Sequence, residues 1–270
     1  RGAAMSGGAN RILVKLGGTL LDEEASRNRL ATEIAQAASG HEVVVVHGGG
    51  KQMTRFLAER GIESRFVNGL RVTTPETVDA VLKVFAGSVN HALVASFVAG
   101  GAKAVGLSGI DAALAVAEQM DPALGAVGRI VSAKPDLLEL LTGAGYLPVV
   151  ACVAGDGKGQ VYNVNADQMA AACAVAFRAD HLVFLTDVAG VLDASKSIVP
   201  SLTPEACDRL IAAGVATGGM QAKLNAAMDA LKQGVKEVVI APGAEPEILA
   251  RLLAGETIGS RLARLESPRV

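Results

Sequence analysis

The sequence predicts an α/β protein, a three-layer αβα sandwich with a mostly parallel central sheet. Short β-branched runs alternate with amphipathic helical stretches along the chain, which is typical of parallel strands covered by helices on both faces. Each β-branched run is followed by Gly, Asp or Pro, residues that end strands. Half of the 270 residues are apolar, enough to fill one large domain or two closely packed lobes.

Six strands and one well-marked helix can be placed on this pattern. The predicted strands are Arg11–Leu16, Glu42–His47, Ala104–Leu107, Leu147–Ala151, His181–Leu185 and Glu237–Ile240. Among the helices between them, the clearest begins at Pro75 behind the capping residue Thr74 and extends toward Gly87.

Two predicted hairpins interrupt the alternation of strands and helices. They are Ile62–Val72 and Val150–Val161, and the second turns at Asp156-Gly157-Lys158-Gly159. The sequence contains no internal repeat, low-complexity tract or linker. Any division of the chain is therefore into two lobes that share one sheet.

Composition argues for a small ligand and a reducing compartment. The net charge is −2, the pI is about 6.1 and no Lys/Arg cluster occurs, so neither a nucleic-acid nor a membrane partner is expected. Three cysteines without CxxC spacing predict buried, reduced thiols and no metal site. Apolar runs such as Val43 to Val46 are of strand length, and Arg1 to Ala9 lacks the apolar core of a signal peptide, so a cytoplasmic location is expected.

Glycines directly follow the first two predicted strands, where bare backbone N–H groups can approach an anion. Lys15-Leu16-Gly17-Gly18 ends the first strand and adds a positive charge. His47-Gly48-Gly49-Gly50 ends the second and opens a helix whose N-terminus favours negative charge. Two such loops imply two anionic groups close together, although either loop alone is explained equally well as an ordinary turn.

Other nucleotide-binding motifs are absent from the sequence. A Walker A loop needs Ser or Thr after Gly-Lys, but Gly50-Lys51 is followed by Gln52. No GxGxxG follows the first strand, and the HRD and DFG elements of protein kinases are missing. A phosphate group bound here is therefore handled by another architecture.

Two further polar clusters lie at predicted helix starts. Asn163 and Asn165 are two residues apart on an extended segment and face the same side, and Asp167 follows in the first helical turn. Capping explains Asn165, but it explains Asn163 and Asp167 less well. Thr217-Gly218-Gly219 opens an Ala-rich helix that carries Lys223. A helical lysine is usually a solvated surface charge, and only the other motifs make Lys223 a candidate site residue.

In order, KLGG, HGGG, NGLRVT, NVNAD and GGMQAK resemble the motif series of the acetylglutamate kinases, members of the amino-acid kinase superfamily. The resemblance covers roughly Ile12 to Leu262, and the combination is far more specific than any one motif. It implies the amino-acid kinase fold, with an N-terminal lobe (residues 10–180) for the acyl amino acid and dimerisation, and a C-terminal lobe (residues 181–270) for ATP. The implied reaction is phosphorylation of the γ-carboxylate of N-acetyl-L-glutamate by ATP with Mg²⁺, the second step of arginine biosynthesis.

The resemblance also implies a role for each motif residue. Lys15 and Lys223 would stabilise the transferring phosphoryl group, and Asp167 would orient both lysines. Predicted substrate-binding residues are Gly49 and Gly50 around the reacting carboxylate, Arg71 on the α-carboxylate and Asn163 on the acylamido end. Predicted ATP-binding residues are Gly17 and Gly18 on the phosphates, with Asp187, Gly190, Leu192, Val215, Ala216 and Thr217 on the adenosine side.

The chemistry agrees with this inventory of residues. A carboxylate is already ionised at neutral pH, so it needs no general base before it attacks phosphorus. Positioning and electrostatic stabilisation by lysines, backbone N–H groups and the Mg²⁺ carried by ATP are enough. The absence of Ser/His/Asp and HExxH arrangements from the sequence is then expected. The role of His47 stays open.

One departure from the family pattern leaves alternatives open. Many members carry Lys-Asp-Gly-Gly where the loop Ser108–Ala113 ends Ile-Asp-Ala-Ala, and this loop is a candidate for shaping the acyl pocket. A kinase for succinylated or carrier-linked glutamate or aminoadipate is therefore an alternative, although Arg71-Val72-Thr73 follows the free-amino-acid pattern. Aspartate and uridylate kinases fit NGLRVT poorly. A non-catalytic binding protein is disfavoured because Lys15, Asp167 and Lys223 are all present.

The resemblance also bears on assembly, because the family divides into dimers and arginine-inhibited hexamers whose extra N-terminal helix links dimers. Arg1 to Asn10 is Gly- and Ala-rich and shorter than the ~12–15 residues that a marginally stable helix needs. We therefore expect a homodimer without arginine feedback. Its contact is expected at the apolar helical region Pro75 to Val98, although packing of that region on its own sheet is nearly as good an explanation.

Overall fold

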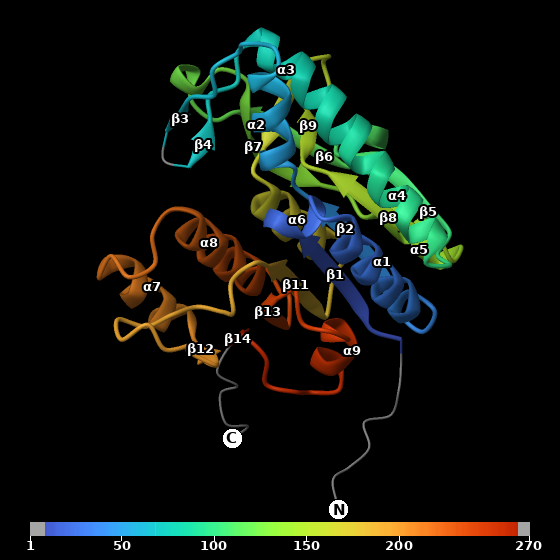
Figure 1. Ribbon diagram of the computed structural model, residues 1–270, viewed down its shortest axis with the longest axis vertical. Helices are drawn as coiled ribbons and strands as arrows, with labels where there is room; N and C mark the ends of the chain where they lie inside the picture. The colour runs from blue at the N-terminus through green and yellow to red at the C-terminus, as the bar shows by residue number, and fades with distance from the viewer. Residues whose placement is uncertain (1–8, 68, 264–270) are drawn as a thin grey trace, which may run out of the picture.

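An eight-stranded, mostly parallel sheet runs through the molecule (Figure 1). The computed structural model describes residues 9–67 and 69–263, and at residues 18 and 19 the backbone alone. The strand order is β12-β14-β13-β11-β1-β2-β8-β5, in which every pair is parallel except the antiparallel pair β13 and β14.

The elements have the following bounds. The strands are β1 Arg11–Leu16, β2 Glu42–His47, β3 Phe66–Val67, β4 Leu70–Arg71, β5 Ala104–Ser108, β6 Ala115–Gln119, β7 Val127–Ala133, β8 Leu147–Ala151, β9 Val153–Gly155, β10 Val161–Val164, β11 His181–Thr186, β12 Ser201–Leu202, β13 Glu237–Pro242 and β14 Ser260–Ala263. The α-helices are α1 Glu24–Ala38, α2 Gly50–Ala58, α3 Pro75–Val81, α4 Asn90–Ala99, α5 Asp136–Gly143, α6 Ala166–Ala176, α7 Pro204–Ala212, α8 Gly218–Lys232 and α9 Ile248–Leu253. The remaining helical segments are η1 Gly18–Leu21, the π-helical η2 Leu82–Val89, η3 Asp111–Ala113 and η4 Pro122–Leu124.

The six predicted strands are all present, and five of them form the interior of the sheet while β5 lies at its edge. β1 lies between β2 and β11, and its residues from Ile12 to Leu16 are buried. Strands covered on both faces have continuous apolar runs instead of alternation, which is why their sequence marks them clearly. The structure extends three of them at the C-terminal end, to Ser108, Thr186 and Pro242.

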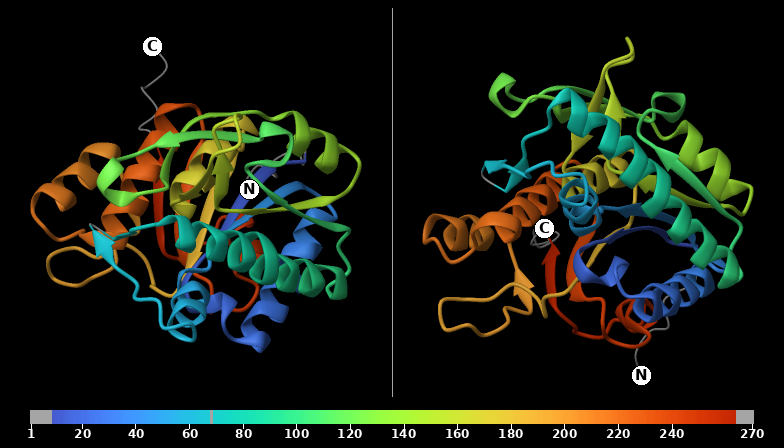
Figure 2. Two further views of the ribbon diagram at one scale, coloured as in Figure 1. Left: turned by 90° about the horizontal axis from the view of Figure 1, so that it is seen from above. Right: turned by 45° about the horizontal axis from the view of Figure 1, so that its top comes forward.

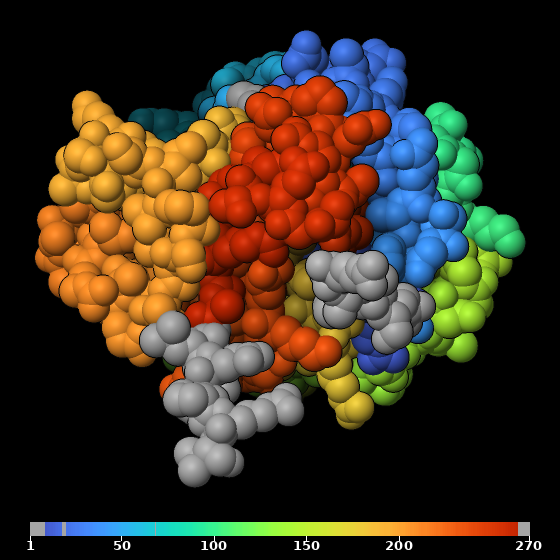
Figure 3. Space-filling model, turned by 90° about the horizontal axis from the view of Figure 1, so that it is seen from below, coloured from blue at the N-terminus to red at the C-terminus, as the bar shows by residue number. Residues whose placement is uncertain are grey.

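Helices cover both faces of the sheet and confirm the three-layer αβα sandwich (Figures 1 and 2). α1, α4 and α9 pack together on one face, and α5, α6 and α8 cover the other. The strands after residue 180 lie together at one end of the sheet, beside β1. Figure 3 shows α9 and its flanking loops lying next to α1. Arg29 of α1 donates to the carbonyl of Glu245 at 3.0 Å across this contact.

The predicted helix at Pro75 begins as expected but ends later. The Thr74 hydroxyl accepts the N–H of Thr77 at 3.3 Å, which confirms the cap. The helix does not end near Gly87, because a π segment, η2, joins α3 to α4 and carries the helical run on to Ala99. This run of 25 residues is long and apolar enough to cross a membrane by composition, and 44% of its most apolar window is buried in the molecule.

Both predicted hairpins are present, but they belong to a structure that the sequence did not reveal. β3 pairs with β4, between which Asn68 lies outside the described residues, and β9 pairs with β10. Asp156 accepts the N–H groups of Lys158 and Gln160 at 2.7 and 3.0 Å and closes the second turn. Strands β6 and β7, which were not predicted, complete a small closed barrel in the order β10-β7-β6-β9.

Candidate active site

Two lysines and one aspartate from three separate elements meet at the carboxyl edge of the sheet. The Nζ atom of Lys15, on β1, lies 2.8 Å from Oδ1 of Asp167, on α6. The Nζ atom of Lys223, on α8, lies 3.1 Å from each oxygen of the same carboxylate. The three residues are 7–8% exposed, so Lys223 is not the solvated surface lysine that its helical context suggests. Two ammonium groups share one carboxylate, which leaves a net charge of +1 for an anion.

The pKa shifts in this centre follow from burial and from the three charges. Burial alone would raise the pKa of Asp167, but Lys15 and Lys223 outweigh it and hold that pKa below its usual range. Burial lowers the pKa of Lys223, and the neighbouring Lys15 lowers it further, while Asp167 and Asp187 oppose both effects. Asp167 therefore stabilises the charged form of Lys223 in a buried place.

The first glycine loop lies directly against the Lys15 ammonium. A Cβ on Gly17 would lie 2.5 Å from Nζ of Lys15, so the lysine side chain folds back over this residue. The Gly17 N–H donates to the Leu185 carbonyl at 3.3 Å, and Gly18 begins the short helix η1. The structure thus brings Gly17 to the charged centre, beside β11.

The second glycine loop presents unpaired N–H groups at the start of α2. Gly49 precedes the helix and Gly50 is its first residue, so the first N–H groups have no intrahelical acceptor. A Cβ on Gly49 would lie 2.8 Å from a ring carbon of Phe85 in η2, which explains glycine at this buried position. An incoming anion can be bound by these N–H groups and by the positive end of the helix.

Arg71 reaches the same helix start from the β3–β4 hairpin. Its Nη2 donates to the Gly50 carbonyl at 3.1 Å and to the Thr54 hydroxyl at 2.8 Å, and Nη1 contacts Ser64. The guanidinium also lies 4.6 Å from the centre of the Phe66 ring. Arg71 is 7% exposed, burial lowers its pKa, and no carboxylate of the described chain pairs with it. A buried cation without a protein counter-ion is suited to bind a carboxylate ligand.

Asn163 is joined to Arg71 through Thr73. Its Nδ2 donates to the Thr73 hydroxyl at 3.0 Å, and that hydroxyl donates to the Arg71 carbonyl at 2.9 Å. β10, which carries Asn163, pairs with β7 and β9 of the small barrel. The neighbouring Asn165 caps α6 through the N–H groups of residues 167 and 168, as predicted, at 2.8 and 3.1 Å.

The six residues predicted for the adenosine side lie in two loops. Asp187, Gly190 and Leu192 follow β11, and a Cβ on Gly190 would lie 2.9 Å from the Ser260 hydroxyl. Val215, Ala216 and Thr217 lead into α8; Ala216 is buried, while Thr217 occupies the capping position without a side-chain cap bond. Among the described residues no hydrogen bond joins one loop to the other. Exposed apolar side chains of Val188, Leu192 and Ile198 flank the first loop.

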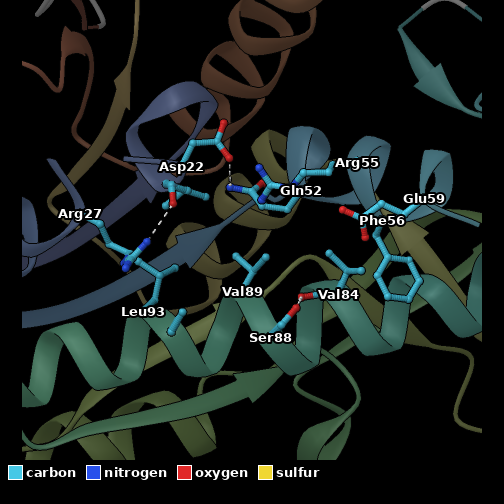
Figure 4. A pocket seen from close by; sticks show the side chains of 12 residues that line it. Asp22, Arg27, Gln52, Arg55, Phe56, Glu59, Val84, Ser88, Val89 and Leu93 are labelled. Carbon is cyan, nitrogen blue, oxygen red and sulfur yellow. Dashed lines mark hydrogen bonds between the residues drawn. The ribbon is translucent and has the colours of Figure 1, made fainter. Parts of the chain in front are cut away.

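A hollow of about 270 Å³ lies between η1, α2 and the long helix (Figure 4). On one wall the Gln52 amide donates to Asp22 at 2.8 Å. Phe56, Val89 and Leu93 form apolar parts of the lining. None of the predicted site residues lines this hollow, so it is separate from the chemistry proposed for the glycine loops.

Sequence reasoning missed several residues that support this site. Ser64 and Thr54 bind Arg71, and Asn90 hydrogen-bonds His47 behind the second glycine loop. The position of His47 beside three glycines was the one available signal. Asn90 is 43 residues away in sequence and nothing local marks it. Within residues 9–67 and 69–263, no group of three His, Cys, Asp or Glu side chains is arranged to hold a metal ion.

Comparisons with known sequences agree with the motif series. The chain matches the amino acid kinase family over residues 10–242. An acetylglutamate kinase of Solibacter usitatus is 67% identical over 253 residues, which cover 93% of this chain and 98% of that relative. An acetylglutamate kinase of Acidobacterium capsulatum is 44% identical over 245 residues, which cover 90% of this chain and 94% of the relative.

Solved structures resemble nearly the whole chain. An N-acetylglutamate synthase from Neisseria gonorrhoeae, complexed with coenzyme A and N-acetyl-glutamate, has a TM-score of 0.84 at 25% identity over 96% of this chain, which spans 60% of the length of the synthase. A carbamate kinase from Giardia lamblia bound to AMP-PNP has a TM-score of 0.69 at 17% identity, over 95% of this chain and 99% of that one, and shares the fold. The chain belongs to the amino acid kinase family and, within it, to the acetylglutamate kinases.

Proposed function

We propose that this protein transfers the γ-phosphoryl group of ATP to the γ-carboxylate of N-acetyl-L-glutamate, the second step of arginine biosynthesis. The observation that carries the proposal is the pair of buried lysines held by one aspartate, a trio with a net charge of +1 that lies against the first glycine loop. The identity of 67% to an acetylglutamate kinase supports the same activity.

The reaction needs charge stabilisation more than proton transfer. A carboxylate oxygen of the substrate forms a bond to the γ-phosphorus while the bond from that phosphorus to the bridging oxygen of ADP breaks. Both reactants are anions, so Lys15 and Lys223 reduce their repulsion and stabilise charge on the transferring oxygens. Asp167 keeps the two ammonium groups together at the point of transfer, and no proton has to leave the substrate.

Arg71 and Asn163 are proposed to bind the acyl amino acid. Arg71 has no carboxylate partner in the described chain and can bind the α-carboxylate, while Asn163, which is linked to Arg71 through Thr73, is proposed to bind the acylamido end. The N–H groups of Gly49 and Gly50 are then available for the reacting carboxylate. Phosphates are proposed to bind at Gly17 and Gly18 with ATP as its Mg²⁺ complex, in which the metal ion arrives as part of the substrate.

One assay separates the candidate substrates. Purified protein is incubated with ATP, Mg²⁺ and a panel of N-acetyl-, N-succinyl- and free glutamate, N-acetylaspartate and aminoadipate, and the acyl phosphate is trapped with hydroxylamine. We expect the hydroxamate with N-acetyl-L-glutamate at the highest kcat/KM. A preference for another member of the panel would reassign the acyl group, and ligand binding without any hydroxamate would favour a non-catalytic regulator.

We further propose a homodimer that forms through the α3–η2–α4 helix and the edge strand β5. The most apolar window of this helix is 44% buried, and Val98 is 55% exposed near its end. β5 ends the sheet order, and an open strand edge accepts a further strand. Light scattering should give the mass of a dimer, and Val98→Asp should shift it to the monomer. A monomeric wild-type protein at micromolar concentration would contradict the proposal.

A further inference from the structure

His47, the last residue of β2, is fully buried behind the second glycine loop, and both ring nitrogens have partners. Nδ1 lies 2.7 Å from the carbonyl oxygen of Gly48, and Nε2 lies 2.9 Å from Nδ2 of Asn90. A carbonyl accepts and an amide NH₂ donates, so Nδ1 carries the proton and Nε2 is bare. The imidazole is therefore neutral and in one tautomer.

The orientation of the Asn90 amide is fixed by its other neighbours. Nδ2 also donates to the Val149 carbonyl at 2.8 Å, so both amide hydrogens are used. Oδ1 points at Gly106, where a Cβ would lie 2.1 Å from it. If His47 were protonated at Nε2, that N–H would face the N–H of the Asn90 amide, and neither group could accept a hydrogen bond from the other. Burial lowers the pKa of His47 to about 4, against the opposing effect of its bond to Gly48, so the neutral form persists at physiological pH.

The bond to Gly48 sets the direction of the next N–H group. The Gly48 carbonyl and the Gly49 N–H belong to one planar trans peptide unit, in which they point in opposite directions. Gly49 is buried, and its N–H has no acceptor among the residues that the structure describes. The Phe85 ring fills the space into which a Cβ of Gly49 would point. A buried N–H without a partner is costly unless a ligand accepts from it.

We propose that His47 is a positioning residue: by holding the Gly48 carbonyl it turns the Gly49 N–H toward the reacting carboxylate of the acyl amino acid. Asn90 keeps His47 in the tautomer that can hold this carbonyl, and Gly106 leaves the space that Asn90 needs. This inference rests on the kinase activity proposed above. No proton moves from His47 during the reaction.

Two substitutions of His47 separate its two hydrogen bonds. In His47→Asn the side-chain NH₂ takes the place of Nδ1–H and can still donate to Gly48. In His47→Gln the side-chain oxygen takes the place of Nε2 and still accepts from Asn90, but the donor to Gly48 is lost. Both variants lose similar packing, so the melting temperature, Tm, should fall in both.

The expected difference lies in the Michaelis constants. His47→Gln should raise KM for N-acetyl-L-glutamate about tenfold or more, because one hydrogen bond to a charged ligand is weakened, while KM for ATP stays within about twofold. His47→Asn should stay closer to the wild type. Equal impairment of the two variants, or an equal rise of both Michaelis constants in His47→Gln, would show that His47 contributes only to packing and does not position Gly49.

A second route reaches the same contact from β5. Gly106→Ala places a methyl group on Oδ1 of Asn90 and should displace the amide from His47. We expect a selective rise of KM for the acyl amino acid like that of Asn90→Ala. Gly40→Ala is the matched control, because nothing lies within 4 Å of a Cβ there. Unchanged Michaelis constants in both Gly106→Ala and Asn90→Ala would remove Asn90 from the inference.

Nitrogen-15 NMR of the histidine rings reports which ring nitrogen carries the proton, independently of enzyme activity. In wild-type protein at neutral pH the ring of His47, assigned by its absence from the spectrum of His47→Gln, should be neutral and Nδ1-protonated, and in Asn90→Ala the same ring should show a mixture of tautomers. A tautomer mixture in active wild-type enzyme would overturn this inference alone. Absence of phosphorylation of any acylated glutamate by the wild type would instead overturn the proposed function, so the two failures are distinguishable.

Discussion

The Nζ atom of Lys15 lies 2.5 Å from the point that a Cβ on Gly17 would occupy. Gly17→Ala must therefore displace the ammonium from its place beside Asp167. Because only the end of a flexible side chain moves, we expect Tm to stay near the wild-type value. kcat should fall about 10²-fold, the cost of misplacing a group by about 1 Å. Steady-state activity assays measure kcat, and thermal melts measure Tm. Gly143→Ala is the control, because no atom lies within 4 Å of a Cβ at that position. Wild-type kcat in Gly17→Ala would show that Lys15 need not occupy this position.

Asp167→Asn removes the carboxylate that holds two buried ammonium groups together. Asp167 opposes the lowering of the pKa of Lys223 by burial and by Lys15, so its loss should lower that pKa further. Activity requires protonated Lys223 and is lost as pH rises through its pKa. The alkaline limb of the kcat profile should therefore move to lower pH, together with a loss of roughly 10²–10³ in kcat. An alkaline limb that stays at the same pH in Asp167→Asn would show that the pKa of Lys223 does not determine it.

The same carboxylate predicts a pH dependence of stability. The pKa of Asp167 in the fold lies below its usual range, so its contribution to the free energy of unfolding is fully present above the pKa of the unfolded chain. That contribution is lost as pH falls through the pKa of the folded state. Urea unfolding of the wild type at a series of acidic pH values should follow this loss, and Asp167→Asn should have a flatter acid limb. Parallel acid limbs in the two proteins would contradict the assignment.

Arg71→Lys tests the assignment of the carboxylate-binding cation. The guanidinium of Arg71 binds Gly50 and Thr54 and can bind a ligand carboxylate at the same time. The ammonium of a lysine has no such fork of N–H donors and cannot make both sets of contacts. KM for the acyl amino acid should rise roughly 10-fold or more, with a smaller change in KM for ATP. Arg55→Lys, an exposed substitution on α2, the helix that contains Gly50 and Thr54, should leave both constants unchanged. Equal effects of Arg71→Lys on both constants would place Arg71 outside the amino-acid pocket.

The loop Ser108–Ala113 holds two alanines in a strained conformation. Ala112 and Ala113 have φ values of 51° and 53°, in the left-handed region that favours glycine. Ala112→Gly and Ala113→Gly should each raise the free energy of unfolding by about 0.5–1 kcal/mol, the relief of strain less the added entropy of the unfolded chain. Ala25→Gly, at an exposed site in α1, should lower it. Destabilisation by both loop substitutions would contradict the strain argument.

The sequence predicted the parallel core well because buried strands and capped helix starts carry local signals. β1, β2 and β8 were predicted to the residue, and the Thr74 cap was correct. β6 and β7 lack such a signal. The residues of β7 after Gly128 are partly buried or exposed without a regular alternation, and they pair with β6 in a register that shifts between Val116 and Ala117.

In the candidate site, too, residues with a local sequence signal were predicted and residues placed by distant contacts were not. Glycines and charged residues in the motif series were found in sequence, and the structure brings Lys15, Asp167 and Lys223 together. The burial of Lys223 could not be read from its helix, because that burial is produced by the facing α6. Asn90 was missed for the same reason, since its contact with His47 joins a helix to a strand 43 residues away.

The π segment η2 has a consequence for changes in chain length. A π turn holds one residue more than an α turn, and each residue of an α-helix turns about 100° around the axis. Deletion of a single residue between Leu82 and Val89 would remove that extra residue and leave an unbroken α-helix, in which Asn90 still faces His47. Insertion of one residue would instead rotate Asn90 away from His47 by about 100°. This stretch is therefore expected to tolerate the loss of one residue better than the gain of one.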